Sequence, residues 1–152
     1  MASNKVKVTL VGKSIVRQKL RLLNFVAAAE VRDAVNESAL NIQSKAKQLC
    51  PVRKAGKILG GRLRASITVE FLNNGMTGEV GTNVDYAPFV EYGTGRRGRA
   101  AAHPPLPGNY AHGSRAGMKA QPFLYPAWDQ ERNSFDRNMA RALKTAARRS
   151  TS

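Results

Sequence analysis

Residues 15–51 read IVRQKLRLLNFVAAAEVRDAVNESALNIQSKAKQLCP, and they carry the longest periodic pattern of the chain. Apolar or small side chains recur in it every three or four residues, at Leu20, Leu23, Ala27, Val31, Ala34, Ser38, Ile42, Ala46 and Leu49. That period predicts one long amphipathic helix, from about Ile15 to Leu49. A kink near Leu23–Val26 fits the same pattern. Pro51 ends the helix, because a residue that precedes proline disfavours helical backbone angles.

The segments on either side of this helix alternate as strands do. Lys5–Val11 places valines and a leucine on one face and polar side chains on the other, which predicts a half-buried strand. Ile67–Phe71 alternates in the same way, Asn73–Gly75 is a turn signal, and Thr77–Thr82 predicts the returning strand of a hairpin. Arg62–Ser66 fits either a helical turn or the start of the first hairpin strand.

The C-terminal half combines an aromatic segment, a loop and a helix. Pro88–Tyr92 fits a short helix that Gly93 ends. Residues 95–120 form a long basic loop without acids, and loops of this length are typically functional or disordered. Pro126 opens a last helix, over about 126–148. One face of that helix carries Trp128, Phe135, Met139, Ala142 and Leu143.

These elements predict an α+β fold in a single domain over residues 1–152. In it a long N-terminal amphipathic helix packs on a small antiparallel β-sheet, with a C-terminal helix beside them. The length of 152 residues fits one domain with one sizeable core.

The charge points to the partners of this chain. Lys and Arg number 25 against 10 Asp and Glu, a net charge of +15, which favours polyanionic partners. Either the basic surface faces acidic neighbours in an assembly or it contacts nucleic acid, and composition leaves both open. The candidate DNA or subunit interface is the loop set Arg96, Arg97, Arg99, Arg115 and Lys119. Such a loop can neutralise phosphates without reading sequence, or it can be solvated, or order only against a neighbouring subunit.

No set of residues in the sequence predicts catalysis, a metal site or a cofactor. Glu30, Asp33 and Glu37 share a helix face, but such a stripe more often is solvated and pairs with nearby basic residues than binds metal. For Asp85 a cap or turn role is favoured over acid–base work, and for Glu91 an intersubunit ion pair. Cys50 is interpreted as a packed thiol. We therefore expect that the protein is not an enzyme.

No segment of the sequence predicts a membrane span. The apolar run Asn24–Ala29 is far too short to cross a bilayer, and the first residues lack the apolar region of a signal peptide. Synthesis in the host cytoplasm is the expectation.

Five motifs in this order resemble those of the tail-completion family of tailed bacteriophages, also called minor tail or head–tail joining proteins. They are Ala46–Val52 (Ala-Lys, an apolar residue, then Pro-Val), Gly61–Ile67 (Gly-x-Leu-x-x-Ser-Ile), Val80–Thr82, Tyr86–Thr94 and Gln121–Ala127 (with Pro-Phe-Leu-x-Pro-Ala). The chain departs from the family in its longer loop at 95–120 and in Lys54-Ala55, where a Thr before Gly is often seen.

The resemblance implies a structural virion protein of the neck or tail, forming a ring at the head–tail junction. We expect a sixfold or twelvefold homo-oligomer that contacts other neck and tail proteins, and the resemblance leaves a contact with packaged DNA open. The shared residues read as fold determinants: Pro51, Leu63, Ser66, Ile67, Gly81, Tyr86, Phe89, Glu91, Gly93, Pro122, Phe123 and Pro126. Glycines at 81 and 93 would permit tight turns, and aromatics including Tyr86 and Phe89 would fill the space between helix and sheet. The alternative is a basic DNA-binding or genome-packaging accessory protein that does not read sequence.

Overall fold

The computed structural model describes residues 6–10, 25–52, 61–94 and 117–150. Its helices are α2 (Phe25–Leu49), α3 (Arg62–Ala65), α4 (Ala87–Tyr92) and α6 (Leu124–Ser150). Its strands are β1 (Val6–Leu10), β2 (Thr68–Leu72) and β3 (Thr77–Thr82). The predicted α+β fold is confirmed, with a long helix packed on a small antiparallel sheet and a C-terminal helix. The predicted helix start at Ile15 lies outside the described residues.

The sheet has β3 at its centre and both other strands at its edges. Its order is β1-β3-β2, and both pairings are antiparallel. Val80 of β3 lies opposite Val8 on one side and Val69 on the other. The hairpin between β2 and β3 turns at Asn73, Asn74 and Gly75, which all have positive φ angles of 52°, 57° and 80°. Asparagine and glycine tolerate this left-handed region best, so the turn signal in the sequence has a direct backbone cause.

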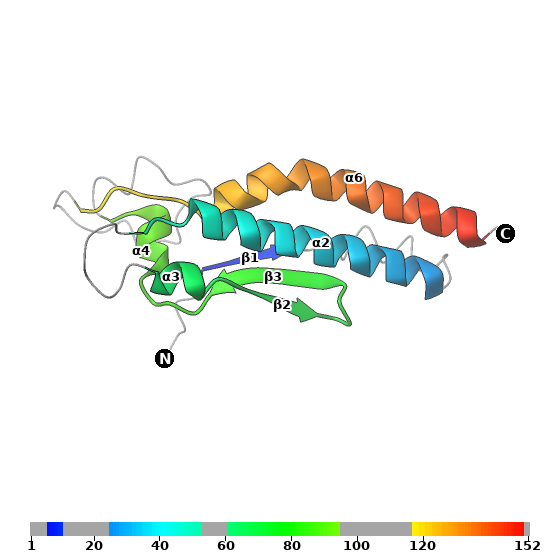
Figure 1. The fold of residues 1–152 in the computed structure, drawn as a ribbon, viewed down its shortest axis with the longest axis horizontal. Helices are drawn as coiled ribbons and strands as arrows, with labels where there is room; N and C mark the ends of the chain where they lie inside the picture. Colours follow the sequence, from blue (N-terminus) through cyan, green and yellow to red (C-terminus); the bar gives the residue numbers. More distant parts are fainter. Residues whose placement is uncertain (1–5, 11–24, 53–60, 95–116, 151–152) are drawn as a thin grey trace.

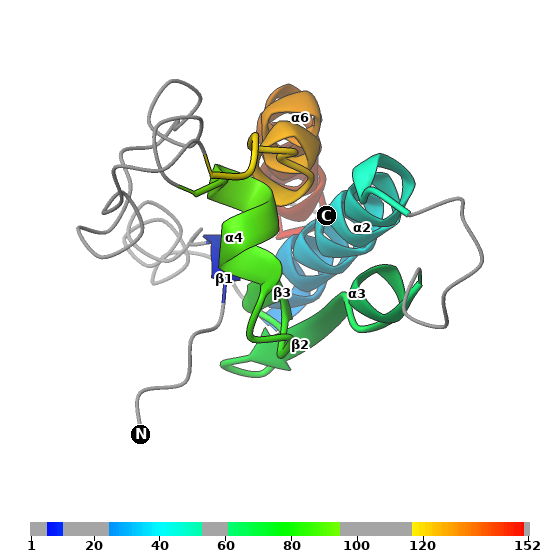
Figure 2. The same cartoon turned by 90° about the vertical axis from the view of Figure 1, so that its left-hand side faces the viewer.

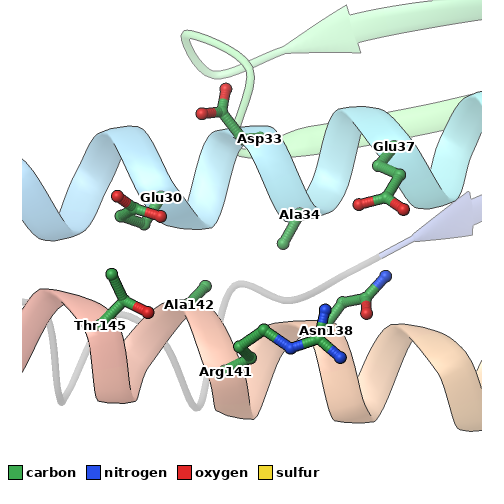
Figure 3. Close-up of a pocket in the computed structure, with 8 residues that line it drawn as sticks. All are labelled: Glu30, Asp33, Ala34, Glu37, Asn138, Arg141, Ala142 and Thr145. Carbon is green, nitrogen blue, oxygen red and sulfur yellow. The ribbon is translucent and has the colours of Figure 1, made fainter.

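Helix α2 lies between the sheet and α6 (Figures 1 and 2). It therefore buries two neighbouring faces. Val35 and Ala39 pack toward β3, where a Cβ added to Gly78 would lie 2.8 Å from the Ala39 Cβ. On the other face Ala34 lies opposite Ala142 of α6 (Figure 3). The small side chains of the predicted stripe let α6 approach closely, and a second buried set that includes Ala39 meets the sheet.

Helix α6 runs beside α2 along most of its length and begins earlier than predicted. It starts at Leu124, two residues before Pro126, which occupies the first turn. Proline is tolerated there because the N–H groups of a first turn have no partner within the helix. Phe135 and Ala142 are buried, and Trp128, Met139 and Leu143 are partly buried against the core, as the sequence pattern predicted.

Candidate functional site

Helix α6 begins on a buried carboxylate that belongs to α4. The side chain of Glu91 is 2% exposed. Its Oε2 accepts hydrogen bonds from the backbone N–H groups of Phe123 at 2.8 Å and Leu124 at 3.0 Å. Its Oε1 accepts a third, from the N–H of Tyr125 at 3.0 Å. The first N–H groups of a helix have no acceptor within the helix and lie at the positive end of its dipole. The Glu91 carboxylate therefore accepts their hydrogen bonds and also places a negative charge at that end.

This geometry corrects two expectations. The intersubunit ion pair expected for Glu91 is wrong, because its carboxylate is buried within one chain and committed to α6. The predicted helix start at Pro126 is also wrong, because the helix begins at Leu124. The Glu91 cap lies 32 residues before Phe123, so it leaves no local signal in the sequence. Asp85 lies in a turn before α4, and α4 has no side-chain cap.

Further hydrogen bonds hold the segment before α6 against α4. The backbone N–H of Gln121 donates to the carbonyl of Val90 at 2.8 Å. The N–H of Thr94 donates to the carbonyl of Met118 at 2.9 Å, and the Met118 N–H donates to the Thr94 hydroxyl at 2.8 Å. Between these contacts Gly93 has φ 72°, which lets the chain leave α4 without steric strain.

A second buried acid joins α6 to α2. Glu131 is 2% exposed, and its Oε2 lies 2.5 Å from the Lys45 ammonium. Its Oε1 accepts a hydrogen bond from the Asn41 amide at 3.2 Å. Buried carboxylates are tolerated when they are paired and hydrogen-bonded, so this contact fixes how the two helices lie against each other.

Motif residues before the hairpin form a small hydroxyl network. The Ser66 hydroxyl donates to the carbonyl of Leu63 at 2.8 Å and lies 2.6 Å from the Thr82 hydroxyl. Because Ser66 has one hydroxyl proton, Thr82 donates in the second contact. Thr82 in turn accepts from the N–H of Val84 at 3.2 Å. The network ties the end of α3 to the end of β3, while Ile67 beside it is fully buried.

Three other motif residues lie elsewhere than expected. Tyr86 and Phe89 are each 39% exposed, so the prediction that they fill the space between helix and sheet is wrong for these two. Tyr92 and Phe123, which the same prediction included, are buried. Gly81 lies inside β3, paired with Lys7 and Thr68, and is not a turn residue. Of the remaining motif set, Leu63 is buried, and Pro51, Pro122 and Pro126 are partly or fully exposed.

Exposed apolar side chains gather at one end of the molecule, which we call the apolar end. This end is formed by α4, α3 and the C-terminal end of α2, and it faces the viewer in Figure 2. Five side chains there, between 36% and 42% exposed, are Leu49, Val52, Tyr86, Phe89 and Met118. Exposed apolar side chains that gather on one part of a protein surface typically mark a protein–protein contact.

The predicted basic loop lies almost entirely outside the described residues. Arg96, Arg97, Arg99 and Arg115 fall within it, and Lys119, the one described member, is exposed just before α6. A second basic surface was missed. Its members are exposed on α6 at spacings of four, three and four residues, and we call it the basic ridge: Arg137, Arg141, Lys144 and Arg148. The 3.6-residue period of a helix would have found it, because those spacings place all four on one face.

An open groove runs between α2 and α6, beside the basic ridge (Figure 3). Its volume is about 140 Å³, and Ala34 and Ala142 lie between its polar residues. Glu30, Asp33 and Glu37 border it on α2, and Arg141 and Thr145 on α6. Asp33 points away toward the hairpin turn (Figure 3). Among the described residues no group of three or more His, Cys, Asp or Glu side chains is placed to hold a metal ion.

Cys50 is a buried thiol at the end of α2. It is 4% exposed, as expected of a packed residue. Burial raises the pKa of the thiol from 9.0 to about 11, the nearby Arg64 guanidinium opposes this rise, and Glu91 adds to it. Thiolates are the reactive form of cysteine, so this thiol is suited to packing and not to nucleophilic chemistry.

None of the described helices is long and apolar enough to cross a membrane.

Comparison with known proteins gives one family. The family model described as "Bacteriophage HK97-gp10, putative tail-component" matches residues 15–93, just over half of the chain. No curated protein and no solved structure matches. The match covers the first three motifs and the fourth as far as Gly93, which follows α4. The chain therefore belongs to the HK97-gp10-like family of bacteriophage tail components.

Proposed function

We propose that this chain is a structural subunit of the neck or upper tail of a tailed phage particle, where copies form a ring at the head–tail junction. Membership in a family of phage tail components supports a place in the virion. The observation that carries the ring is the apolar end, because a ring needs one surface of each copy to meet a different surface of the next. We propose no catalytic activity and no cofactor for it.

Two features of the fold suit such a role. The capped start of α6 and the Lys45–Glu131 pair fix both long helices, so the apolar end is presented on a rigid support. The family motifs at 61–67, 80–82 and 86–94 build that support through the hydroxyl network and the Glu91 cap. Pre-organised surfaces bind with less loss of conformational entropy than flexible ones.

Electron microscopy of particles assembled without this protein tests the role. Filled heads that accumulate apart from tails, or tails with a defective top, are the expected result, and resupplying the wild-type chain should restore joined particles. Normal infectious virions in its absence would exclude a structural role at the junction.

A matched pair of variants tests the apolar end. Leu49→Ser with Tyr86→Ser changes two exposed side chains of this end, whereas Leu40→Ser with Phe71→Ser changes two side chains of comparable exposure elsewhere. We expect separated heads and tails with the first pair and joined particles with the second. Equal behaviour of the two pairs would contradict an interface at the apolar end.

Contact with DNA is the second candidate function, and the net charge of +15 favours it. We propose that the loop side chains of Arg96, Arg97 and Arg99 face the lumen of the ring or a neighbouring ring. An assembled particle with these side chains in bulk solvent would exclude it.

A further inference from the structure

We propose that Glu91 is the positioning residue of the apolar end, because its buried carboxylate fixes the rotation of α4 and so turns Tyr86 and Phe89 outward. This inference rests on the proposed function, since it concerns the surface through which copies would meet. It gives Glu91 a role in assembly beside its role in the stability of α6.

Helix α4 has an exposed side and a buried side. Tyr86, which precedes the helix with helical backbone angles, and Phe89 are each 39% exposed, whereas Glu91 is 2% exposed. With about 3.6 residues per turn, Glu91 lies about 160° around the helix from Phe89 and about 140° from Tyr86. The carboxylate and the two exposed aromatic rings therefore project from opposite sides. Whatever holds the carboxylate also determines where the rings point.

The apolar side chains of α4 do not fix this rotation by themselves. Phe89 and Tyr92 are separated by only about 60° around the helix. Phe89 is nevertheless 39% exposed and Tyr92 only 7%. A rotation by that angle would bury one aromatic ring in place of the other, at little hydrophobic cost. Ala87 and Pro88 share the buried side, but their side chains carry no polar group that would require one orientation.

The carboxylate does require one orientation. Side chains of a helix end about 5 to 6 Å from its axis, so a rotation by about 60° would move the Glu91 carboxylate about 5 Å, beyond the reach of its hydrogen bonds. It would lose the N–H groups of Phe123, Leu124 and Tyr125, which now lie 2.8 to 3.0 Å from its oxygens. An unpaired buried carboxylate is far more costly than an exchange of rings, so the contact with α6 selects the rotation.

The main chain beside α4 brings a third residue of the apolar end into place. The N–H of Gln121 donates to the carbonyl of Val90 at 2.8 Å, and Thr94 and Met118 are joined by two hydrogen bonds of 2.9 and 2.8 Å. Met118 is 36% exposed and belongs to the apolar end. The same segment continues into the N–H groups that Glu91 holds. One carboxylate therefore links the start of α6 to three of the five side chains of this surface.

The test compares two variants of the full chain that each break one buried carboxylate contact. Glu91→Gln removes the charge at the start of α6 and keeps nearly the same shape. Lys45→Met breaks the pair with Glu131, which lies between α2 and α6 and not at α4. Urea denaturation should show that Lys45→Met loses at least as much stability, so it controls for stability. Glu91→Asp, which keeps the charge on a shorter side chain, replaces Glu91→Gln if that variant does not fold.

Amide hydrogen exchange of the isolated chain reports the position of α4. The amides of Thr94 and Gln121 donate across the contact between α4 and the segment before α6. Relative to the amides of β3, we expect them to exchange at least about tenfold faster in Glu91→Gln and at a nearly unchanged rate in Lys45→Met. Unchanged exchange in Glu91→Gln, or an equal increase in both variants, would overturn the proposal.

The yield of joined particles reports whether assembly uses this position of α4. We expect Glu91→Gln to lower the yield at least about tenfold and Lys45→Met to change it less than about twofold, because binding weakens with the fraction of copies whose α4 is correctly rotated. Equal yields in the two variants would mean that Glu91 acts through stability alone or not at all, and would overturn the positioning role.

The variant Leu49→Ser with Tyr86→Ser separates this failure from a failure of the proposed function. If it leaves heads apart from tails while Glu91→Gln joins them normally, only the positioning role is wrong. If both variants join heads to tails normally, the apolar end is not the contact surface, and the interface that the proposed function assigns to it is wrong as well.

Discussion

The first turn of α6 is tied to the rest of the chain by a buried carboxylate, whereas its last turns meet α2 through alanines and expose long cations to solvent. One helix therefore has an anchored half and a presenting half. The first is held by charge-assisted hydrogen bonds that require exact positions, and the second needs only close packing of small side chains. Changes in the anchored half should cost folding free energy, whereas changes of exposed side chains in the presenting half should change it little.

The largest expected loss of stability comes from Glu91→Ala. It leaves three N–H groups at the buried start of α6 without an acceptor, and we expect a loss of about 3 kcal/mol in the free energy of unfolding. Glu91→Gln, which keeps one acceptor oxygen, should lose about half as much. Urea denaturation measures both. Asp136→Ala, an exposed acid on the same helix, is the control and should change stability by less than about 0.5 kcal/mol.

Lys45→Met should cost about 2 kcal/mol, because it leaves the buried Glu131 carboxylate with Asn41 alone. The double variant Lys45→Met with Glu131→Met should be more stable than the sum of its single changes predicts. A double-mutant cycle by urea denaturation gives the coupling free energy, which we expect to be about 1 to 2 kcal/mol. Additive single effects would mean that the pair does not hold the two helices together.

Gly78→Ala tests the contact between α2 and the sheet. The added Cβ would lie 2.8 Å from the Ala39 Cβ, so the strand or the helix must move, at a cost of about 1 to 2 kcal/mol. Ala39→Gly removes the opposing methyl group but costs about 1 kcal/mol of helix stability. The double variant should therefore be less destabilised than the sum of the two single variants. If the changes in unfolding free energy of the two single variants add to that of the double variant within about 0.3 kcal/mol, the two Cβ positions do not contact each other.

The smallest effect at neutral pH concerns Cys50. Its pKa is raised to about 11 in the folded chain from 9.0, so the folded state favours the neutral thiol. The stability that this contributes is present below pH 9 and is lost as pH rises through 11. The unfolding midpoint should therefore fall further between pH 8 and pH 10.5 in the wild type than in the Cys50→Ala variant. An identical fall in both proteins would contradict burial as the cause of the raised pKa.

Much of the fold could be read from local patterns. The long helix up to Leu49, the strands over 67–71 and 77–82, and the turn at Asn73–Gly75 follow from periodicity, from a proline and from left-handed backbone angles. These signals lie within a few residues of the structure that they determine. The ridge on α6 belongs to this class as well, since its spacing is visible in the sequence.

The candidate contacts could be read only in part. The aromatic segment was expected to be buried as a whole, but Tyr92 is buried while Tyr86 and Phe89 are exposed. Phe89 and Tyr92 lie three residues apart on a six-residue helix, so their directions differ by only about 60°, and the sequence does not say which of them meets the core. The charge of Glu91 was likewise evident from the sequence, but its contact with the N–H groups at the start of α6 was not.

The elements, their amphipathic faces, the excess of positive charge and the family motifs are all evident from the amino-acid sequence. The tertiary structure alone decided that β1 pairs with β3, that α2 is buried on two faces, and that the acids at 91 and 131 are internal. The physical reason is distance along the chain. Helix period and turn preference act over a few residues, whereas the contacts of Glu91 with Phe123 and of Lys45 with Glu131 join residues 32 and 86 positions apart, which only folding brings together.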